Sequence, residues 1–290
     1  MLLQVKQQEA YMRYMKKEEN KVLINNWLAK EKLVYGGDIE YKFRYDNSTI
    51  ELYSVSGTPL MGGSETVTIH IPSFVNKLKE GLFKGVCSGI KLVYTGNSIK
   101  STYRLFENYN GKTVDLSGFN ASAVIDMGYM FNSSENLESV VMECIDTSNV
   151  KNMGNMFSHA IRLRSIDISG LKTNNVEDMG SMFEGCINLL NIEIGNIDTS
   201  NVKNMQSMFQ ECCMLASLDL SGIDTRKVNN MNCMFNGCYA LKNLDISNLS
   251  TASIYDSYGL EGMFNDTICL ELDLENMDEK LVQAYRDRNI

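Results

Sequence analysis

The chain has 290 residues, of which 44% are hydrophobic and 22% charged, and this composition excludes a wholly disordered protein. Its formal net charge of -9 disfavours a nucleic-acid partner, because phosphate binding needs a basic face. His70 and His159 are its two histidines, and there is no G-x-S-x-G, H-E-x-x-H, phosphate-loop or C-x-x-C motif, so we expect no enzyme, no catalytic or metal-binding residue and no cofactor.

Residues 1–35 carry seven basic and four acidic side chains, so this stretch is basic within an acidic protein. Its apolar residues can form one face of a helix, which would cap the first strand of the fold, dock on a partner or lie on a membrane surface. The stretch lacks the uninterrupted apolar core of a secretory signal, and no run in the chain approaches the roughly 20 apolar residues of a membrane span. We therefore predict a helical cap at 1–35 and a cytoplasmic protein without membrane insertion, or a cell-surface or secreted one if a leader is missing.

Residues 36–65 have the pattern of a β-hairpin followed by a linker. The segments IEYKFRY and TIELYSV alternate apolar and polar residues and flank Asp46, Asn47 and Ser48, which favour a turn. Gly57 and Pro59 then begin a linker before the strand-like segment VTIHI.

Residues 66–277 contain an internal repeat. Phenylalanines that follow a methionine or leucine recur at intervals of 23, 25, 26, 26, 26, 26 and 29 residues, at Phe83, Phe106, Phe131, Phe157, Phe183, Phe209, Phe235 and Phe264. Each unit has a strand-like half of the form L-x-x-L-x-L and a half whose apolar residues are spaced as on a helical face, preceded by a threonine such as Thr199 as the expected N-cap. Because neither half can bury its apolar side alone, about eight units must stack into a solenoid.

The repeat also explains the eight cysteines of the chain. Cys186, Cys212 and Cys238 recur at intervals of 26 residues, and the equivalent positions in earlier units are Ser134 and Ala160. A position occupied by Cys, Ser and Ala requires a small side chain, so we expect a buried column of packed cysteines beside a column of phenylalanines and methionines.

The final residues, 278–290, are predicted to form a helix that closes the stack. The complete prediction is an α/β repeat solenoid of the leucine-rich-repeat kind, with short parallel strands and short helices or helical turns, a helix and hairpin at the N-terminal end and a capping helix at the C-terminal end.

Two segments carry a resemblance to a known family. Residues 146–157 (DTSNVKNMGNMF) and 198–209 (DTSNVKNMQSMF) resemble the repeats of BspA-like bacterial surface proteins, a branch of the leucine-rich-repeat class. This resemblance implies a bacterial protein, and it implies adhesion or binding of host proteins at the cell surface.

One face of the predicted sheet is a candidate binding surface. The residue between the last two apolar positions of each strand points out of a concave sheet, and there the sequence has Val141, an acidic row of Asp167, Glu193, Asp219 and Asp245, and then Asp273. Small polar residues flank the row, namely Ser165, Asn191, Ser217 and Asn243 on one side. Such a face favours a basic protein partner, although aspartates could simply solvate an exposed strand.

The sequence supports three functions. The first is a non-enzymatic protein-interaction module that uses the concave face or the terminal caps. The second, from the resemblance, is a surface adhesin or secreted host-interacting factor. The third is a carbohydrate- or ligand-binding protein or enzyme with a site near the N-terminal region, where Tyr41, Phe43, Tyr45 and Tyr53 either anchor a partner or pack across the hairpin. The partner's identity and the oligomeric state stay open.

Overall fold

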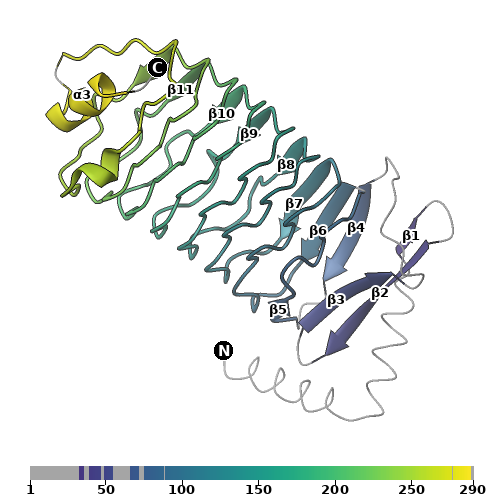
Figure 1. Ribbon diagram of the computed structural model, residues 1–290. Coiled ribbons are helices and arrows are strands. Elements are labelled where there is room, and N and C mark those ends of the chain that lie inside the picture. The colour runs from purple at the N-terminus through teal and green to yellow at the C-terminus, as the bar shows by residue number, and fades with distance from the viewer. Residues whose placement is uncertain are drawn as a thin grey trace, which may run out of the picture.

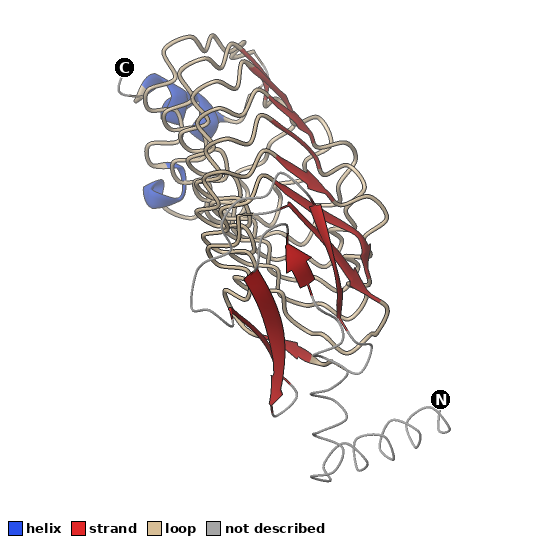
Figure 2. Ribbon diagram, turned by 90° about the vertical axis from the view of Figure 1, so that its right-hand side faces the viewer, coloured by secondary structure: helices blue, strands red, loops and turns tan. Residues whose placement is uncertain are grey.

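The computed structural model describes residues 33–35, 39–46, 49–54, 66–71, 75–87, 89–275 and 277–288. The chain winds into successive coils that follow one another in one direction, so the molecule is an elongated solenoid (Figure 1). The strands lie along one side of the coils and turns and loops form the rest (Figure 2). This is the predicted leucine-rich-repeat-like solenoid. Among the described residues, no helix is long and apolar enough to cross a lipid bilayer.

The predicted hairpin is present at the N-terminal end. Strands β2 (Ile39–Asp46) and β3 (Thr49–Ser54) pair antiparallel, with Asp46 opposite Thr49. Strand β1 (Leu33–Tyr35) pairs antiparallel with β2, so the end of the segment predicted as helix is a strand, and the predicted helix before it lies outside the described residues. Strand β3 also pairs parallel with β5 (Lys77–Leu78), and this pairing joins the hairpin to the solenoid.

The strand side of the solenoid begins with four parallel strands in the order β4-β6-β7-β8. These are β4 (Thr66–Ile71), β6 (Gly89–Tyr94), β7 (Thr113–Phe119) and β8 (Ser139–Val141). Four three-residue strands continue it as two parallel pairs: β9 (Ser165–Asp167) with β10 (Asn191–Glu193), and β11 (Ser217–Asp219) with β12 (Asn243–Asp245).

The second half of the coils, predicted as short helices or helical turns, consists of turns in the described repeats, and the last coil adds a short 3-10 helix at Ser257–Leu260. Each coil has two residues with a positive φ around its repeat phenylalanine: one stands two positions before the phenylalanine and the other two positions after it. Around Phe157 they are Asn155 (57°) and His159 (59°). A residue in this left-handed conformation breaks the regular backbone of a right-handed helix. The N–H groups of Asn155, Phe157 and His159 instead donate to carbonyls of the next coil, at 2.8, 2.9 and 2.6 Å. The turn segment is therefore a second ladder between coils.

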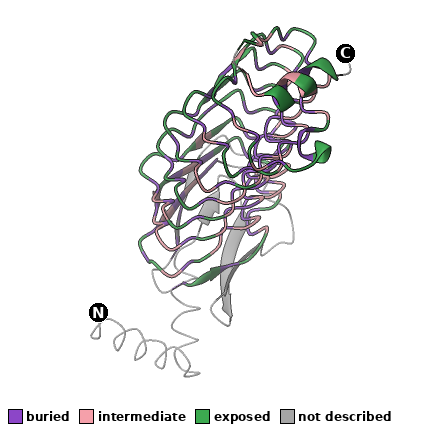
Figure 3. Cartoon of the chain, turned by 90° about the vertical axis from the view of Figure 1, so that its left-hand side faces the viewer, coloured by how far each residue is buried: buried purple, intermediate pink, exposed green. Residues whose placement is uncertain are grey.

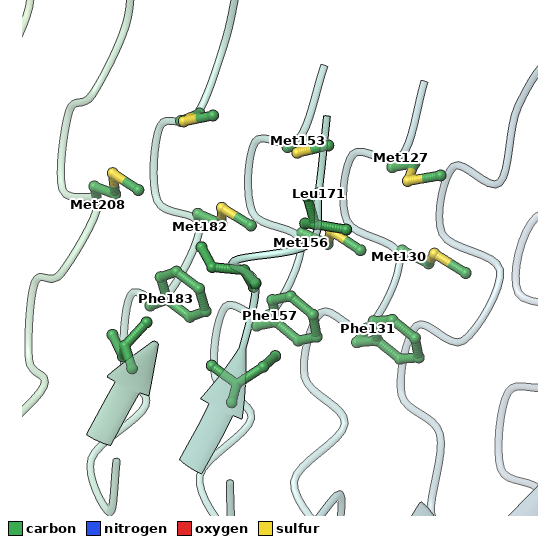
Figure 4. Packing of buried hydrophobic residues seen from close by; sticks show 14 of the residues in the cluster. Met127, Met130, Phe131, Met153, Met156, Phe157, Leu171, Met182, Phe183 and Met208 are labelled. Carbon is green, nitrogen blue, oxygen red and sulfur yellow. The ribbon is translucent and has the colours of Figure 1, made fainter. Parts of the chain in front are cut away.

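Stacked aromatic rings fill the centre of the solenoid. All eight repeat phenylalanines are buried, and the ring centroids of consecutive members lie 4.6–5.9 Å apart with interplanar angles of 2–20°. Buried methionines line the column, as Met156 and Met182 do beside Phe157 and Phe183 (Figure 4). The predicted column of phenylalanines and methionines is confirmed, and Figure 3 shows buried positions recurring from coil to coil.

A column of buried threonines has a role that the sequence does not predict. The hydroxyl of Thr199 donates to the carbonyl of Asp224 in the next coil at 3.0 Å and accepts from the N–H of the same residue at 2.8 Å. Thr147 and Thr225 make the same pair of bonds to the coil that follows each of them. These threonines are therefore not helix N-caps, since no helix follows them, and they tie successive coils together.

The cysteine column is buried as predicted, and its thiols also form hydrogen bonds. The thiols of Cys186, Cys212 and Cys238 donate to the carbonyls of Phe157, Phe183 and Phe209, at 3.1, 3.3 and 3.1 Å. The hydroxyl of Ser134 makes the equivalent bond to Phe106 at 2.7 Å. Burial raises the pKa of Cys186 and of Cys238 to about 12.

We expect these three thiols to resist alkylation in the folded protein, because the reactive species is the thiolate. At pH 8, iodoacetamide should label the exposed Cys144 and Cys269 and leave Cys186, Cys212 and Cys238 unmodified, as measured by peptide mass spectrometry. Labelling in denaturant, where all eight thiols should react, is the control. Fast native labelling of the column would contradict its packing role.

A helix packs against the last described coil near the C-terminal end. After the 3-10 helix η1 (Ser257–Leu260), helix α3 (Glu279–Arg286) begins behind the N-cap Asp278, and the ring of Tyr285 packs edge-on against Phe264 at 5.7 Å. The carboxylate of Asp278 accepts from the hydroxyl of Thr251 at 2.7 Å, where earlier threonines contact the backbone of a following coil. At Thr251 the partner of the hydroxyl is thus a side-chain carboxylate, where the earlier threonines have a backbone carbonyl.

This cap should make the C-terminal end sensitive to acid. Burial raises the pKa of Asp278, but hydrogen bonds from Thr251 and the α3 backbone outweigh it, so the pKa lies below its ordinary value. The ionised carboxylate therefore stabilises the cap fully above pH of about 4, and that contribution is lost as the pH falls through the lowered pKa. Amide protection of α3, measured by hydrogen exchange from pH 7 to pH 3, should fall in the wild type, whereas Asp278→Asn should be less protected at pH 7 and change less. Identical profiles would contradict this role.

Candidate functional site

The acidic row lies on the exposed side of the strands, as predicted. Asp167, Glu193, Asp219 and Asp245 are all exposed, and the residue between each of them and the flanking Ser or Asn points into the core. Glu193 is the register partner of Asp167, and Asp245 is that of Asp219. Paired parallel strands are about 4.8 Å apart, so the two carboxylates of each strand pair lie side by side.

The flanking polar residues lie where the sequence places them. Each is the first residue of its strand, two positions before a row member, and each is exposed: Ser165, Asn191, Ser217 and Asn243. All eight predicted site residues therefore lie together on one surface. Val141 is also exposed in β8, whereas Asp273 is exposed but follows the last strand.

The aspartates of the row close the turn that follows each strand, a role that the sequence analysis missed. Asp167 accepts hydrogen bonds from the backbone N–H and the hydroxyl of Ser169, at 2.9 and 2.6 Å. Asp245 does the same with Ser247, at 3.0 and 2.7 Å, and Asp219 accepts from the N–H of Ser221 at 2.9 Å. The Asp-x-Ser spacing after each strand is the signal that could have revealed this turn.

These turn bonds stabilise the charged form of the three aspartates in the row. The hydroxyl and then the N–H of the following serine lower the pKa of Asp167 and of Asp245, and for Asp219 the N–H of Ser221 lowers it most while the neighbouring Asp245 opposes the change. Each turn engages Oδ1 of its aspartate, and within the described residues no hydrogen bond is made to the three Oδ2 atoms. The three aspartates of the row therefore present ionised oxygens to solvent.

On the N-terminal side of the row, the equivalent carboxylate is neutralised by an ion pair. In β7, Asp115 occupies the strand position equivalent to the row, and Lys91 from β6 donates to its Oδ2 at 2.7 Å. Val141 then separates this ion pair from Asp167. Within the row, the direct side-chain partners are the turn serines and Asn191, which donates to Glu193 at 2.8 Å. Uncompensated charge is therefore concentrated in β9 to β12.

A groove at the C-terminal end is a second concave feature. It has a volume of about 700 Å³ and lies between the end of the last coil and α3, lined in part by Tyr255, Leu260, Glu261, Lys280 and Ala284. Lys280 donates to the carbonyl of Ile254 at 2.6 Å, which fixes α3 against that coil. The groove lies beside the terminal cap that the sequence analysis named as an alternative binding element.

The described residues do not assemble a recognisable catalytic site. His159 is exposed in a turn, as predicted, and its Nδ1 lies 2.8 Å from the hydroxyl of Ser158. Ser158 is buried, however, so a substrate has no access to that oxygen. Among the described residues, no three His, Cys, Asp or Glu side chains are placed to hold a metal ion. The hairpin tyrosines and Phe43 lie on β2 and β3, and their side chains are outside the described structure.

Comparisons with known proteins identify a family and two remote structural relatives. Residues 100–218 and 213–287, more than half of the chain, match the family model described as "Mycoplasma protein of unknown function, DUF285". A leucine-rich repeat protein from Bacteroides ovatus is 15% identical with a TM-score of 0.27, and the alignment covers 89% of this chain and 98% of that one. The pneumococcal vaccine antigen PcpA is 9% identical with a TM-score of 0.28, covering 75% and 70%. No curated protein matches.

Proposed function

The chain belongs to the family of Mycoplasma proteins of unknown function, DUF285, and from that premise we propose that it is a non-enzymatic scaffold that binds a basic protein partner through the acidic row. The observation that carries this proposal is the alignment of four exposed carboxylates on consecutive strands of one rigid face, with the three aspartates held in their ionised form by turn hydrogen bonds. Such a face steers an oppositely charged partner and fixes its register.

The rigidity of the face supports recognition over simple solvation. Each row member follows a core residue of a three-residue strand, and the columns of phenylalanine and threonine fix the spacing of the coils. Because the turn serines already position the aspartates, a partner would not have to order them, and preorganised side chains lose little entropy on binding.

We also propose that the repeats are of the BspA-like kind. The residues that carry the resemblance occupy defined places: Thr199 links two coils, while Met205, Met208 and Phe209 lie in the central core. These places explain why that segment is repeated, and they leave the surface of each coil free to vary with the partner.

The test is a binding comparison between matched charge variants. Binders are first selected from a displayed peptide library against the wild-type chain, and their affinities are then measured for Asp167→Asn/Glu193→Gln/Asp219→Asn/Asp245→Asn. The amides keep the turn hydrogen bonds and remove the charges, so affinity for the main class of binders should fall at least tenfold. The control is Asp146→Asn/Asp198→Asn/Asp224→Asn, which removes charges from Asp turns at another edge of the coils. Equal affinity for wild type and row variant would place the binding site elsewhere.

A further inference from the structure

We propose that an exposed apolar stripe beside the acidic row docks an amphipathic α-helix of the partner, with one apolar face flanked by Lys or Arg on both sides. The stripe consists of Ile187, Leu190, Met214, Tyr239 and Ile268. This inference rests on the proposed function and names the chemistry of the partner.

The stripe lies in the connection between the turn segment and the next strand. Ile187, Tyr239 and Ile268 each follow the repeat phenylalanine by four residues, so they occupy one position in different coils, and Cys213 occupies it in the coil between Ile187 and Tyr239. The five side chains of the stripe are 38–57% exposed. Isolated exposed apolar residues are ordinary, but these recur in the same connection of four successive coils, which favours an interaction surface.

The core does not need these side chains, because other residues fill the interior of the same connection. Leu189 and Leu215 are fully buried beside them. The backbone of the connection is also tied between coils: Asn188 donates to the carbonyl of Ile161 at 2.6 Å, and the N–H of Leu190 donates to Arg164 at 2.8 Å. The stripe is thus a fixed surface that folding leaves exposed.

Carboxylates flank the stripe on both sides in its first two coils. Glu184 and Glu211 precede it on the turn side, and Glu193 and Asp219 follow it on the strand side. The sequence between the two carboxylates of each of these coils contains no basic residue; Arg162 and Arg164 lie in the coil before the stripe, and Lys242 lies in the coil of Tyr239. An apolar strip between two negative edges is complementary to a helix whose apolar face lies between two rows of positive charge.

The spacing of the coils favours a helix over an extended peptide. From Phe157 to Phe264 the coils repeat every 5.6–5.9 Å, as measured between ring centroids. An α-helix rises about 5.4 Å per turn, so a helix along the stack presents one side chain to each coil. Residues on one face of an extended strand recur about every 6.7 Å. The side chains of an extended peptide would therefore fall out of register with the coils by about 1 Å per coil. The stripe spans three coil intervals, from the coil of Phe183 to that of Phe264, and these need a helix of about 12 residues.

The probe for this inference is a synthetic peptide of 18 residues with one leucine per helical turn and lysines on both sides of that face. A control peptide has the same composition with the leucines distributed around the helix. Affinity is measured by titration calorimetry with the full-length wild type and with Ile187→Ser/Leu190→Ser/Met214→Ser. The matched variant is Ile125→Ser/Tyr258→Ser, which removes two exposed apolar side chains outside the stripe and outside the C-terminal groove. Because every substituted residue is exposed, thermal unfolding should confirm that both variants fold.

We expect the wild type to bind the probe at least tenfold more tightly than it binds the control peptide. The stripe variant should bind the probe at least tenfold more weakly than the wild type does, and the matched variant should bind it as tightly as the wild type. Equal affinity for wild type and stripe variant, or no binding of the probe to the wild type, would overturn the inference. The row variant separates the two proposals. If the probe binds the stripe variant but not the row variant, the stripe proposal is overturned and the scaffold function stands. If the probe binds the row variant but not the stripe variant, the proposed role of the row is overturned and the stripe proposal stands.

Discussion

Phe209→Ala should lower the free energy of unfolding by about 3–5 kcal/mol, the usual cost of truncating a fully buried phenylalanine. Phe209 is completely buried, and its ring centroid lies 5.9 Å from those of Phe183 and Phe235 on either side. The substitution removes apolar contacts and both stacking interactions, and it leaves a cavity between two coils. Urea denaturation followed by circular dichroism measures the change.

The control for this prediction is Leu190→Ala, because Leu190 is an exposed leucine near the same coils and its truncation should change stability by less than about 0.5 kcal/mol. A loss of under about 1 kcal/mol in Phe209→Ala would show that the coils are not held together by the aromatic column. Because each coil contacts its neighbours alone, we expect the disturbance to be largest in the coils of Phe183 and Phe235.

Thr199→Val should cost about 2–4 kcal/mol, although valine has nearly the same volume as threonine. The Thr199 hydroxyl accepts from the N–H and donates to the carbonyl of Asp224, and the substitution leaves both backbone groups without that partner. Thr199→Ser keeps the hydroxyl, so it should recover most of the loss. Equal urea midpoints for the valine variant and the wild type would show that the threonine column contributes only its volume.

The repeat and the core were predictable because each depends on residue type at fixed spacing. Phe157, Phe183 and Phe209 stand 26 residues apart, and an aromatic ring at one place in every coil has to stack on the next. The position of Cys212 was also predictable, because Ser134 and Ala160 at the equivalent places showed that the site admits small side chains. The strand-side exposure of Asp167 and Asp219 followed from the alternation of two neighbouring apolar positions.

The turn segment was not predictable in the same way. Apolar residues such as Val202, Met205 and Met208 have helical spacing, but Ser207 and Glu211 have positive φ of 53° and 57°. Neither residue type signals that conformation as glycine would, so the sequence pattern favours a helix. The backbone adopts the turns because its N–H groups then bond to the next coil, a contact that exists only in the stack.

The exposure of the acidic row was predictable, but the turns that its aspartates close were not predicted. The spacing marked Asp167 and Asp245 as exposed charges, whereas their hydrogen bonds to Ser169 and Ser247 become visible in the folded chain. The exposed stripe around Leu190 and Met214 was missed because an apolar residue next to a strand is expected in the core. Its exposure depends on which side of the connection faces outward, and the sequence does not specify that.

Carboxyl footprinting shows directly whether the acidic row is the surface that contacts the partner. The chain is labelled with a carbodiimide and glycine amide, alone and with the binder selected by display, and labelling at each carboxylate is measured by mass spectrometry. We expect protection of Asp167, Glu193, Asp219 and Asp245, with Asp146, Asp198 and Asp224 labelled equally in both states. Protection of the second set with the row still fully labelled would contradict the proposed role of the row.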